Sequence, residues 1–203
     1  MKNKKGFLLI SLGLLLVAAA LVLAGYNLYD ESRAARSAKQ AVARLEELVS
    51  PETPPDEPAK PADDPVRDTQ ELEIPDHVLN PGMDMPVQTI DGQVYIGVLR
   101  IPALDLELPI ISAWSYPRLK IAPCRYEGSA YLGNLVLAGH NYRSHFGSLK
   151  NLVPGDTVTF TDMDGNVFTY EVAVLETLQP TAVEDMTAGG WDRSGLLRKV
   201  NYL

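Results

Sequence analysis

The chain has little cysteine and no concentration of positive charge in its body. Cys124 is the only cysteine among 203 residues, so the chain cannot form an internal disulfide framework. Its 18 Lys and Arg residues are outnumbered by 26 Asp and Glu residues, giving a formal net charge of -8 at pH 7. Proteins that bind nucleic acid gather Lys and Arg on one surface. We therefore expect no nucleic acid among the main partners.

Charge is absent altogether from residues 6–26, and Lys2, Lys4 and Lys5 come just before this apolar run. A helix needs roughly 20 apolar residues to cross the hydrocarbon layer of a membrane. Because basic flanks stay in the cytoplasm, we predict a transmembrane anchor at residues 1–29. The protein would cross the cell membrane once, with an extracellular domain. A cleaved signal peptide is the alternative, with a small-residue site at residues 22–24, although the core of a signal peptide is typically about 7–15 residues long.

Two further segments separate the anchor from the body of the chain. Residues 30–49 predict a membrane-proximal helix, because apolar residues recur at helical spacing. These residues are Ala34, Ala38, Val42, Leu45 and Val49. An Ala-rich seam buries little area, so we interpret the helix as a solvated stalk, with a coiled-coil contact as the alternative. Residues 50–76 are rich in proline and acidic residues and predict an extended linker.

The sequence pattern of the body, residues 77–203, predicts an all-β domain. Short runs rich in Val, Ile, Thr, Tyr and Phe are bounded by Gly and Pro, and no long amphipathic helix interrupts them. The runs are "VYIGVLRIPAL", "LELPII", "GNLVLAG", "DTVTFTD" and "NVFTYEVAVLETL". Asp164 and Gly165 predict the turn of a hairpin between the last two runs.

The chemistry-bearing candidate is His140, which follows an apolar strand and Gly139 in "NLVLAGHNYRSHFG". An imidazole titrates near neutral pH and can pass a proton to a leaving amine, but catalysis also needs a nucleophile and an oxyanion stabiliser. His140 and His145 together suggest a zinc site, and a metal-dependent hydrolase that uses both is one alternative. No Glu stands between them in a helical frame, so we expect no metal and no cofactor. Asn141 and Tyr142 are candidates for orienting His140 or contacting substrate, and His77 is interpreted as a solvated loop residue.

The order of motifs resembles the sortase family of Gram-positive cell-surface cysteine transpeptidases. The resemblance runs from about residue 94 to residue 186, and its most specific parts are "IPALDLELPI", "NLVLAGHNY" and "LVPGDTV". It implies an eight-stranded β-barrel behind an N-terminal transmembrane helix, of class B- or D-like character, with His140 as the catalytic histidine. In the family, a cysteine in a Thr-Leu-x-Thr-Cys strand attacks a surface protein's sorting signal. A peptidoglycan or pilin amine then resolves the thioester, and a downstream arginine steadies the oxyanion.

The sequence departs from this pattern after Trp191 and Asp192. The family's cysteine is expected near residue 198, yet "MTAGGWDRSGLLRKVNYL" contains neither that cysteine nor its strand. We therefore expect a C-terminally incomplete copy, truncated after about residue 192 by a frameshift or premature end, whose barrel lacks its last strands and is poorly folded and inactive.

No other residue is expected to supply the nucleophile or the arginine that the predicted site lacks. Arg125, next to Cys124, can lower the pKa of the thiol, but this adjacency does not place the thiol near His140. We therefore interpret Cys124 as an incidental loop or half-buried thiol rather than the nucleophile. Arg118, Arg125 and Arg143 do not match the family's arginine. A non-catalytic, membrane-anchored peptide-binding β-domain is the main alternative function.

Overall fold

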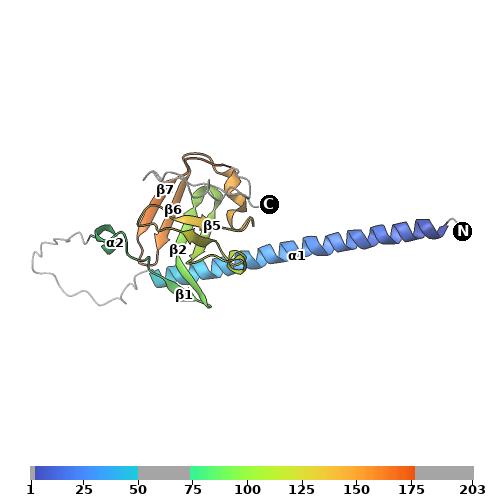
Figure 1. The fold of residues 1–203 in the computed structure, drawn as a ribbon, viewed down its shortest axis with the longest axis horizontal. Helices are drawn as coiled ribbons and strands as arrows, with labels where there is room; N and C mark the ends of the chain where they lie inside the picture. The colour runs from blue at the N-terminus through green and yellow to red at the C-terminus, as the bar shows by residue number, and fades with distance from the viewer. Residues whose placement is uncertain (1–2, 50–73, 177–203) are drawn as a thin grey trace, which may run out of the picture.

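The computed structural model describes residues 3–49 and 74–176. Its first element is a single helix, α1 (Asn3–Val49), of 47 residues, which joins the predicted anchor and membrane-proximal segments without a break. At about 1.5 Å per residue it is about 70 Å long. Its N-terminal part projects away from the β-domain, and its C-terminal part lies along it (Figure 1).

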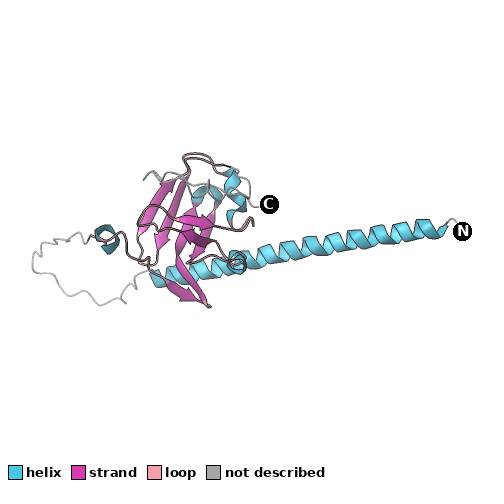
Figure 2. Cartoon of the chain, in the orientation of Figure 1, coloured by secondary structure: helices cyan, strands magenta, loops and turns pink. Residues whose placement is uncertain are grey.

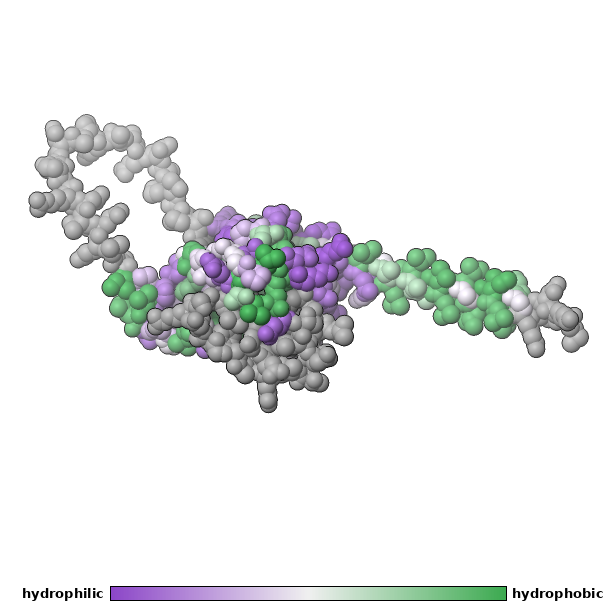
Figure 3. All heavy atoms as spheres, turned by 90° about the horizontal axis from the view of Figure 1, so that it is seen from above, coloured by the Kyte–Doolittle hydropathy of each residue, from purple (hydrophilic) through white to green (hydrophobic). Residues whose placement is uncertain are grey.

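The N-terminal part of α1 is long and apolar enough, by length and composition, to cross a membrane. Its most apolar window has a mean hydropathy of 2.9, and none of that window is buried against the rest of the chain. Figure 3 shows this projecting part as predominantly hydrophobic, in contrast to the mixed surface of the domain. An exposed apolar surface of this kind is stable only in an apolar environment.

The domain is built on one curled sheet, drawn in magenta in Figure 2, in which every pairing is antiparallel except a single parallel one. Its strands are β1 (Gln88–Ile90), β2 (Gln93–Ile101), β3 (Leu106–Ile111), β4 (Cys124–Glu127), β5 (Val136–Ala138), β6 (Thr157–Asp162) and β7 (Val167–Glu171). Short helices lie before or between them: α2 (Asp76–Leu79) precedes β1, and η1 (Pro102–Leu104), α3 (Tyr116–Leu119) and η2 (Phe146–Asn151) connect later strands. The spatial order is β5-β4-β3-β2-β6-β7, with β1 paired to β2. The all-β prediction is confirmed as a half-barrel.

Two hairpins show how local sequence builds this sheet. β6 and β7 form the predicted one, and the buried carboxylate of Asp162 accepts hydrogen bonds from the backbone N–H groups of Asp164 (3.0 Å) and Asn166 (2.9 Å). The β1–β2 hairpin was not predicted. Its turn residues Asp91 (φ 48°) and Gly92 (φ 77°) both have positive φ, which is typical of a tight type I′ hairpin turn.

One apolar cluster fills the curl of the sheet, around the fully buried ring of Phe160. A second cluster lies between the sheet and α1, where Leu45 is 0% exposed. The α1 residues buried there, or against the same face, are Ala34, Ala38, Ala41, Val42 and Leu45. The interpretation of residues 30–49 as a solvated stalk is therefore wrong, because a helix with this seam covers apolar side chains that the sheet would otherwise expose to water.

Cys124 and His77 also differ from their predicted surroundings. Cys124 is not a loop residue: it begins β4, pairs with Ile111 and Ala138, and is completely buried. His77 lies in α2 and stacks on Tyr131, with ring centroids 4.7 Å apart, so it is half-buried rather than solvated. The predicted linker lies mostly in residues 50–73, and the predicted C-terminal departure lies in residues 177–203, both outside the described residues.

Candidate active site

β5 places His140 at the end of the sheet, and Gly139, the residue before His140, allows a close packing contact. A Cβ atom on Gly139 would lie 2.4 Å from Cδ2 of Phe146, the first residue of η2. The backbone N–H of Phe146 donates a 3.2 Å hydrogen bond to the carbonyl of His140. The missing side chain at Gly139 thus lets the loop after β5 fold back on the strand, with His140 at its start.

The imidazole of His140 is half-buried and stacks on the ring of Tyr142, with centroids 3.8 Å apart and planes 21° apart. Its Nδ1 is buried and has no hydrogen-bond partner among the described residues. Burial lowers the pKa of His140 from 6.5, and the positive charge of Lys120 acts in the same direction, while the carboxylate of Asp30 opposes both. At neutral pH the ring is therefore mainly neutral and able to accept a proton.

The loop that begins at His140 is tied to α1 by two hydrogen bonds. The phenol of Tyr142 donates to Asp30 Oδ2 at 2.6 Å, and the backbone N–H of Arg143 donates to Glu31 Oε1 at 2.9 Å. Sequence reasoning named Tyr142 but missed both acidic residues. No local pattern could have revealed them, because their partners lie 112 positions away.

His145 lies in the interior behind this loop. It is 0% exposed, and neither ring nitrogen has a hydrogen-bond partner of normal geometry among the described residues. Burial, helped by the charge of His140, lowers its pKa to about 4, and the nearby carbonyl of Ile121 opposes this shift only weakly. Among residues 3–49 and 74–176 no group of three or more His, Cys, Asp or Glu side chains is placed to hold a metal ion.

Cys124 does not share the environment of His140. Its backbone pairs with Ala138, two residues before His140, but its thiol packs in the cluster between the sheet and α1. The Sγ–H donates to the carbonyl of Ala122 at 3.4 Å. Burial raises the pKa of the thiol to about 11, against weaker opposing effects of the Ser115 backbone and Arg118. A thiol with so little thiolate is a poor nucleophile at neutral pH.

Two of the three arginines considered from the sequence bind the backbone of the same short segment after β3. The guanidinium groups of Arg118 and Arg125 donate to backbone carbonyls, at Ala113 (3.1 Å) and Ser112 (2.8 Å) respectively. Arg143 is exposed in the His140 loop and bonds α1 through its backbone. Of the three, Arg143 alone lies in the loop that begins at His140.

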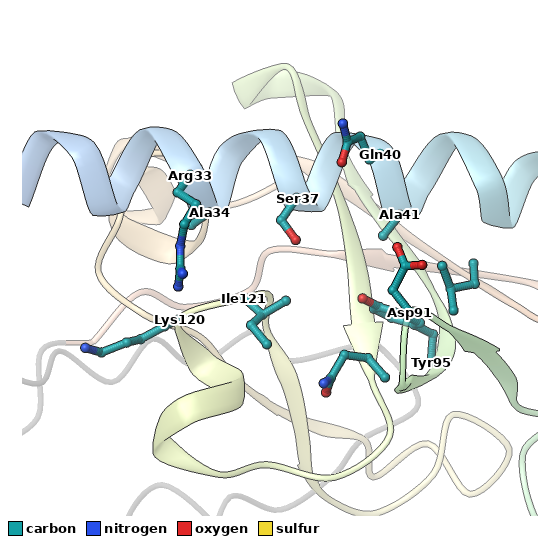
Figure 4. A pocket seen from close by; sticks show the side chains of 11 residues that line it. Arg33, Ala34, Ser37, Gln40, Ala41, Asp91, Tyr95, Lys120 and Ile121 are labelled. Carbon is teal, nitrogen blue, oxygen red and sulfur yellow. The ribbon is translucent and has the colours of Figure 1, made fainter.

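A hollow of about 300 Å³ lies between α1 and the β1–β2 hairpin. Figure 4 shows Arg33 extending from α1 toward the segment that carries Lys120 and Ile121. Lys120 also lowers the pKa of His140. The hollow and the His140 loop therefore share Lys120 as a neighbour.

The chain matches a family described as "Sortase domain" over residues 99–195. Solved structures similar to it include sortase C from Clostridium perfringens SM101, with 20% identity, a TM-score of 0.43, and coverage of 54% of this chain and 61% of that one. Sortase C1 from Streptococcus agalactiae is 27% identical, with a TM-score of 0.41 and coverage of 48% and 54%. A Clostridium perfringens sortase D5 transpeptidase is 20% identical, with a TM-score of 0.41 and coverage of 46% and 61%. The search of curated proteins gave no match.

This chain thus spans 54% to 61% of the length of those three structures. The family assignment rests on the domain match and not on these modest structural likenesses. The matched residues include the last three residues of β2 and all of β3 to β7, with Gly139, His140 and the loop that docks on α1. Residues 99–195 thus form a sortase domain.

Proposed function

We propose that this sortase domain recognises the sorting-signal peptide of a cell-surface protein, and that His140 is its proton-transfer residue. The observation behind this proposal is the neutral, half-buried imidazole at the end of β5, within the residues that match the family. The acceptor would be an amine of peptidoglycan or of a pilin subunit, and no cofactor or metal takes part.

In sortase chemistry a thiolate attacks the carbonyl carbon of the scissile peptide bond. The C–N bond then breaks, and the leaving amine takes a proton from the imidazolium. When the acceptor amine attacks the thioester, the neutral imidazole takes the amine's proton and the thiolate leaves. The lowered pKa of His140 favours the neutral form that this second step requires.

Cys124, the single cysteine of this sequence, is not suited to be that nucleophile, because it is completely buried and its pKa is raised to about 11. We therefore expect this chain by itself to cleave no peptide. The burial of Cys124 equally favours the second candidate function, a non-catalytic domain that binds a sorting-signal peptide.

We further propose that residues 1–29 anchor the protein by one pass through the cell membrane, with the domain on the outer face. The apolar, unburied window of α1 supports the anchor, and the Lys residues before it support the orientation. Residues 30–49 would hold the domain next to the membrane, and residues 50–76 would be the linker between this helix and the body at residues 77–203.

The test uses the full chain in lipid nanodiscs with fluorescent sorting-signal peptides and scrambled controls. We expect saturable binding of at least one sorting signal, competed by the unlabelled peptide, and no cleavage product by mass spectrometry. Absence of both binding and cleavage would overturn the sortase proposal. Cleavage that is lost in Cys124→Ser would overturn the statement that Cys124 is not the nucleophile.

A further inference from the structure

We propose that Tyr142 is a positioning residue for His140, and that Asp30, at the membrane-proximal part of α1, is its anchor. The docking of the helix would then set the orientation of the imidazole. This inference rests on the proposed role of His140.

Tyr142 is in contact with both partners through different parts of its side chain. Its ring lies almost parallel to the imidazole of His140 at a centroid distance of 3.8 Å, which fixes the plane of the imidazole. Its hydroxyl, at the far end of the ring, donates to the carboxylate of Asp30 at 2.6 Å. A bond of this kind to an ionised acceptor is short and stronger than one between neutral groups.

The backbone of Tyr142 is held as firmly as its ring. Its carbonyl accepts hydrogen bonds from the N–H groups of His145 (3.0 Å) and Gly147 (2.8 Å). A Cβ atom on Gly147 would lie 2.7 Å from that same carbonyl oxygen, so the loop closes tightly there. The neighbouring Arg143 N–H adds the second bond to α1, at Glu31. With its backbone fixed and its hydroxyl anchored, the ring of Tyr142 has little freedom to leave His140.

Asp30, which holds the hydroxyl of Tyr142, lies close to the end of the apolar run. Asp30 follows Tyr26, the last residue of that run, by four positions (30 minus 26), or about 6 Å along the helix. The Asp30 side chain is only 15% exposed, because the loop covers it. A helix that spans the membrane up to Tyr26 would thus hold the His140 loop next to the lipid surface. Tilting or withdrawal of the helix would then release Tyr142.

The experiment follows the ring signals of the histidines in the full chain, labelled with isotopic histidine and placed in lipid nanodiscs. The chain contains only three histidines, so each can be assigned by substitution. In the wild type, the stacked Tyr142 ring should shift the carbon-bound ring protons of His140 upfield. Tyr142→Phe keeps an aromatic ring and removes the bond to Asp30, Asp30→Ala removes the acceptor, and Tyr142→Leu removes the ring itself.

Asp91→Ala is the matched control. It removes a 2.6 Å ion pair between Arg44 of α1 and the β1–β2 turn, which is a second link between the same helix and the domain. His77, stacked on Tyr131, reports in the same spectrum whether the domain is still folded.

We expect Tyr142→Phe and Asp30→Ala each to lose most of the upfield shift of His140, Tyr142→Leu to lose all of it, and Asp91→Ala to keep it. The positioning proposal is overturned if Tyr142→Phe and Asp30→Ala leave the His140 signals in place, or if Asp91→Ala moves them as far. Because no cleavage is measured, this outcome is independent of whether the domain binds or processes a sorting signal.

Discussion

The phenol of Tyr142 and the carboxylate of Asp30 form a 2.6 Å hydrogen bond between positions 112 residues apart. This bond is the largest cause of the lowered pKa of Asp30. Burial, followed by the effect of Asp30, raises the pKa of Tyr142 to about 12. At neutral pH the phenol is therefore protonated and the carboxylate ionised, which are the forms that the bond requires.

The bond should survive mild acidification. Because the pKa of Asp30 is lowered in the folded state, its contribution to stability is present above the ordinary aspartate value of 3.8 and is lost only as the pH falls through the lowered value. In a pH titration of the chain with carbon-labelled tyrosine, the Tyr142 ring carbon bearing the hydroxyl should keep a constant shift at neutral and mildly acidic pH and move only below pH 3.8. Asp30→Ala should remove that step. A step well above this pH in the wild type would contradict the prediction.

The seam between α1 and the sheet should contribute strongly to stability. Leu45 is 0% exposed and Leu48, one turn further along the same helix, is 58% exposed. We expect Leu45→Ala to lower the free energy of unfolding by about 2–5 kcal/mol, because it leaves a cavity under the helix. Leu48→Ala should change it by less than about 0.5 kcal/mol. Urea unfolding of the full chain in nanodiscs measures both, and equal effects would show that the helix does not pack as described.

Sequence patterns predicted the elements whose signals are local. Alternating β-formers and the Asp164-Gly165 turn gave the β6–β7 hairpin, and the apolar run gave the long helix. The β1–β2 hairpin carried the same kind of signal at Asp91-Gly92, and it was missed because β1 has only 3 residues. β4 was missed because Pro123 and Gly128, which bound it, read as a loop.

The residues of the candidate site also divide into those with a local sequence signal and those without one. His140 could be identified because a strand, a glycine and a histidine stand together in the chain. The contacts of Asp30 and Glu31 could not, because they arise only when α1 docks on the loop. The stalk interpretation failed for the same reason: the Ala-rich seam buries little area per residue, but the sheet offers it a complementary apolar face.

The buried ring of His145 should make the domain less stable in mild acid. Its pKa is about 4 when folded, against an ordinary value of 6.5, so the unfolded chain binds more protons between these values. The free energy of unfolding should therefore fall as the pH falls, by about 2 kcal/mol between about pH 7 and pH 5. His145→Leu cannot be protonated and should show a much flatter dependence. Urea midpoints of both proteins at several pH values measure this, and equally steep curves would rule out His145 as the cause.

Gly139 and Phe146 provide a steric test of how His140 is placed. The hypothetical Cβ of residue 139 is 2.4 Å from the Phe146 ring, a separation that real Cβ atoms do not adopt, whereas at Gly82 the nearest atom is 3.7 Å away. Gly139→Ala should therefore lower the free energy of unfolding by about 1–3 kcal/mol and shift the ring signals of His140, while Gly82→Ala should leave those signals in place.

If the clash is the cause, a smaller side chain at position 146 should relieve it. We expect the double variant Gly139→Ala with Phe146→Leu to be more stable than the sum of the two single effects predicts, by about 0.5–3 kcal/mol. Urea unfolding of the four proteins gives this coupling energy, and the same samples show whether the His140 signals return toward their wild-type positions. Strict additivity would mean that Gly139 is needed for another reason, such as the path of its backbone. Positive coupling together with recovery of the His140 signals would show that the packing of one glycine against one ring determines where the imidazole lies.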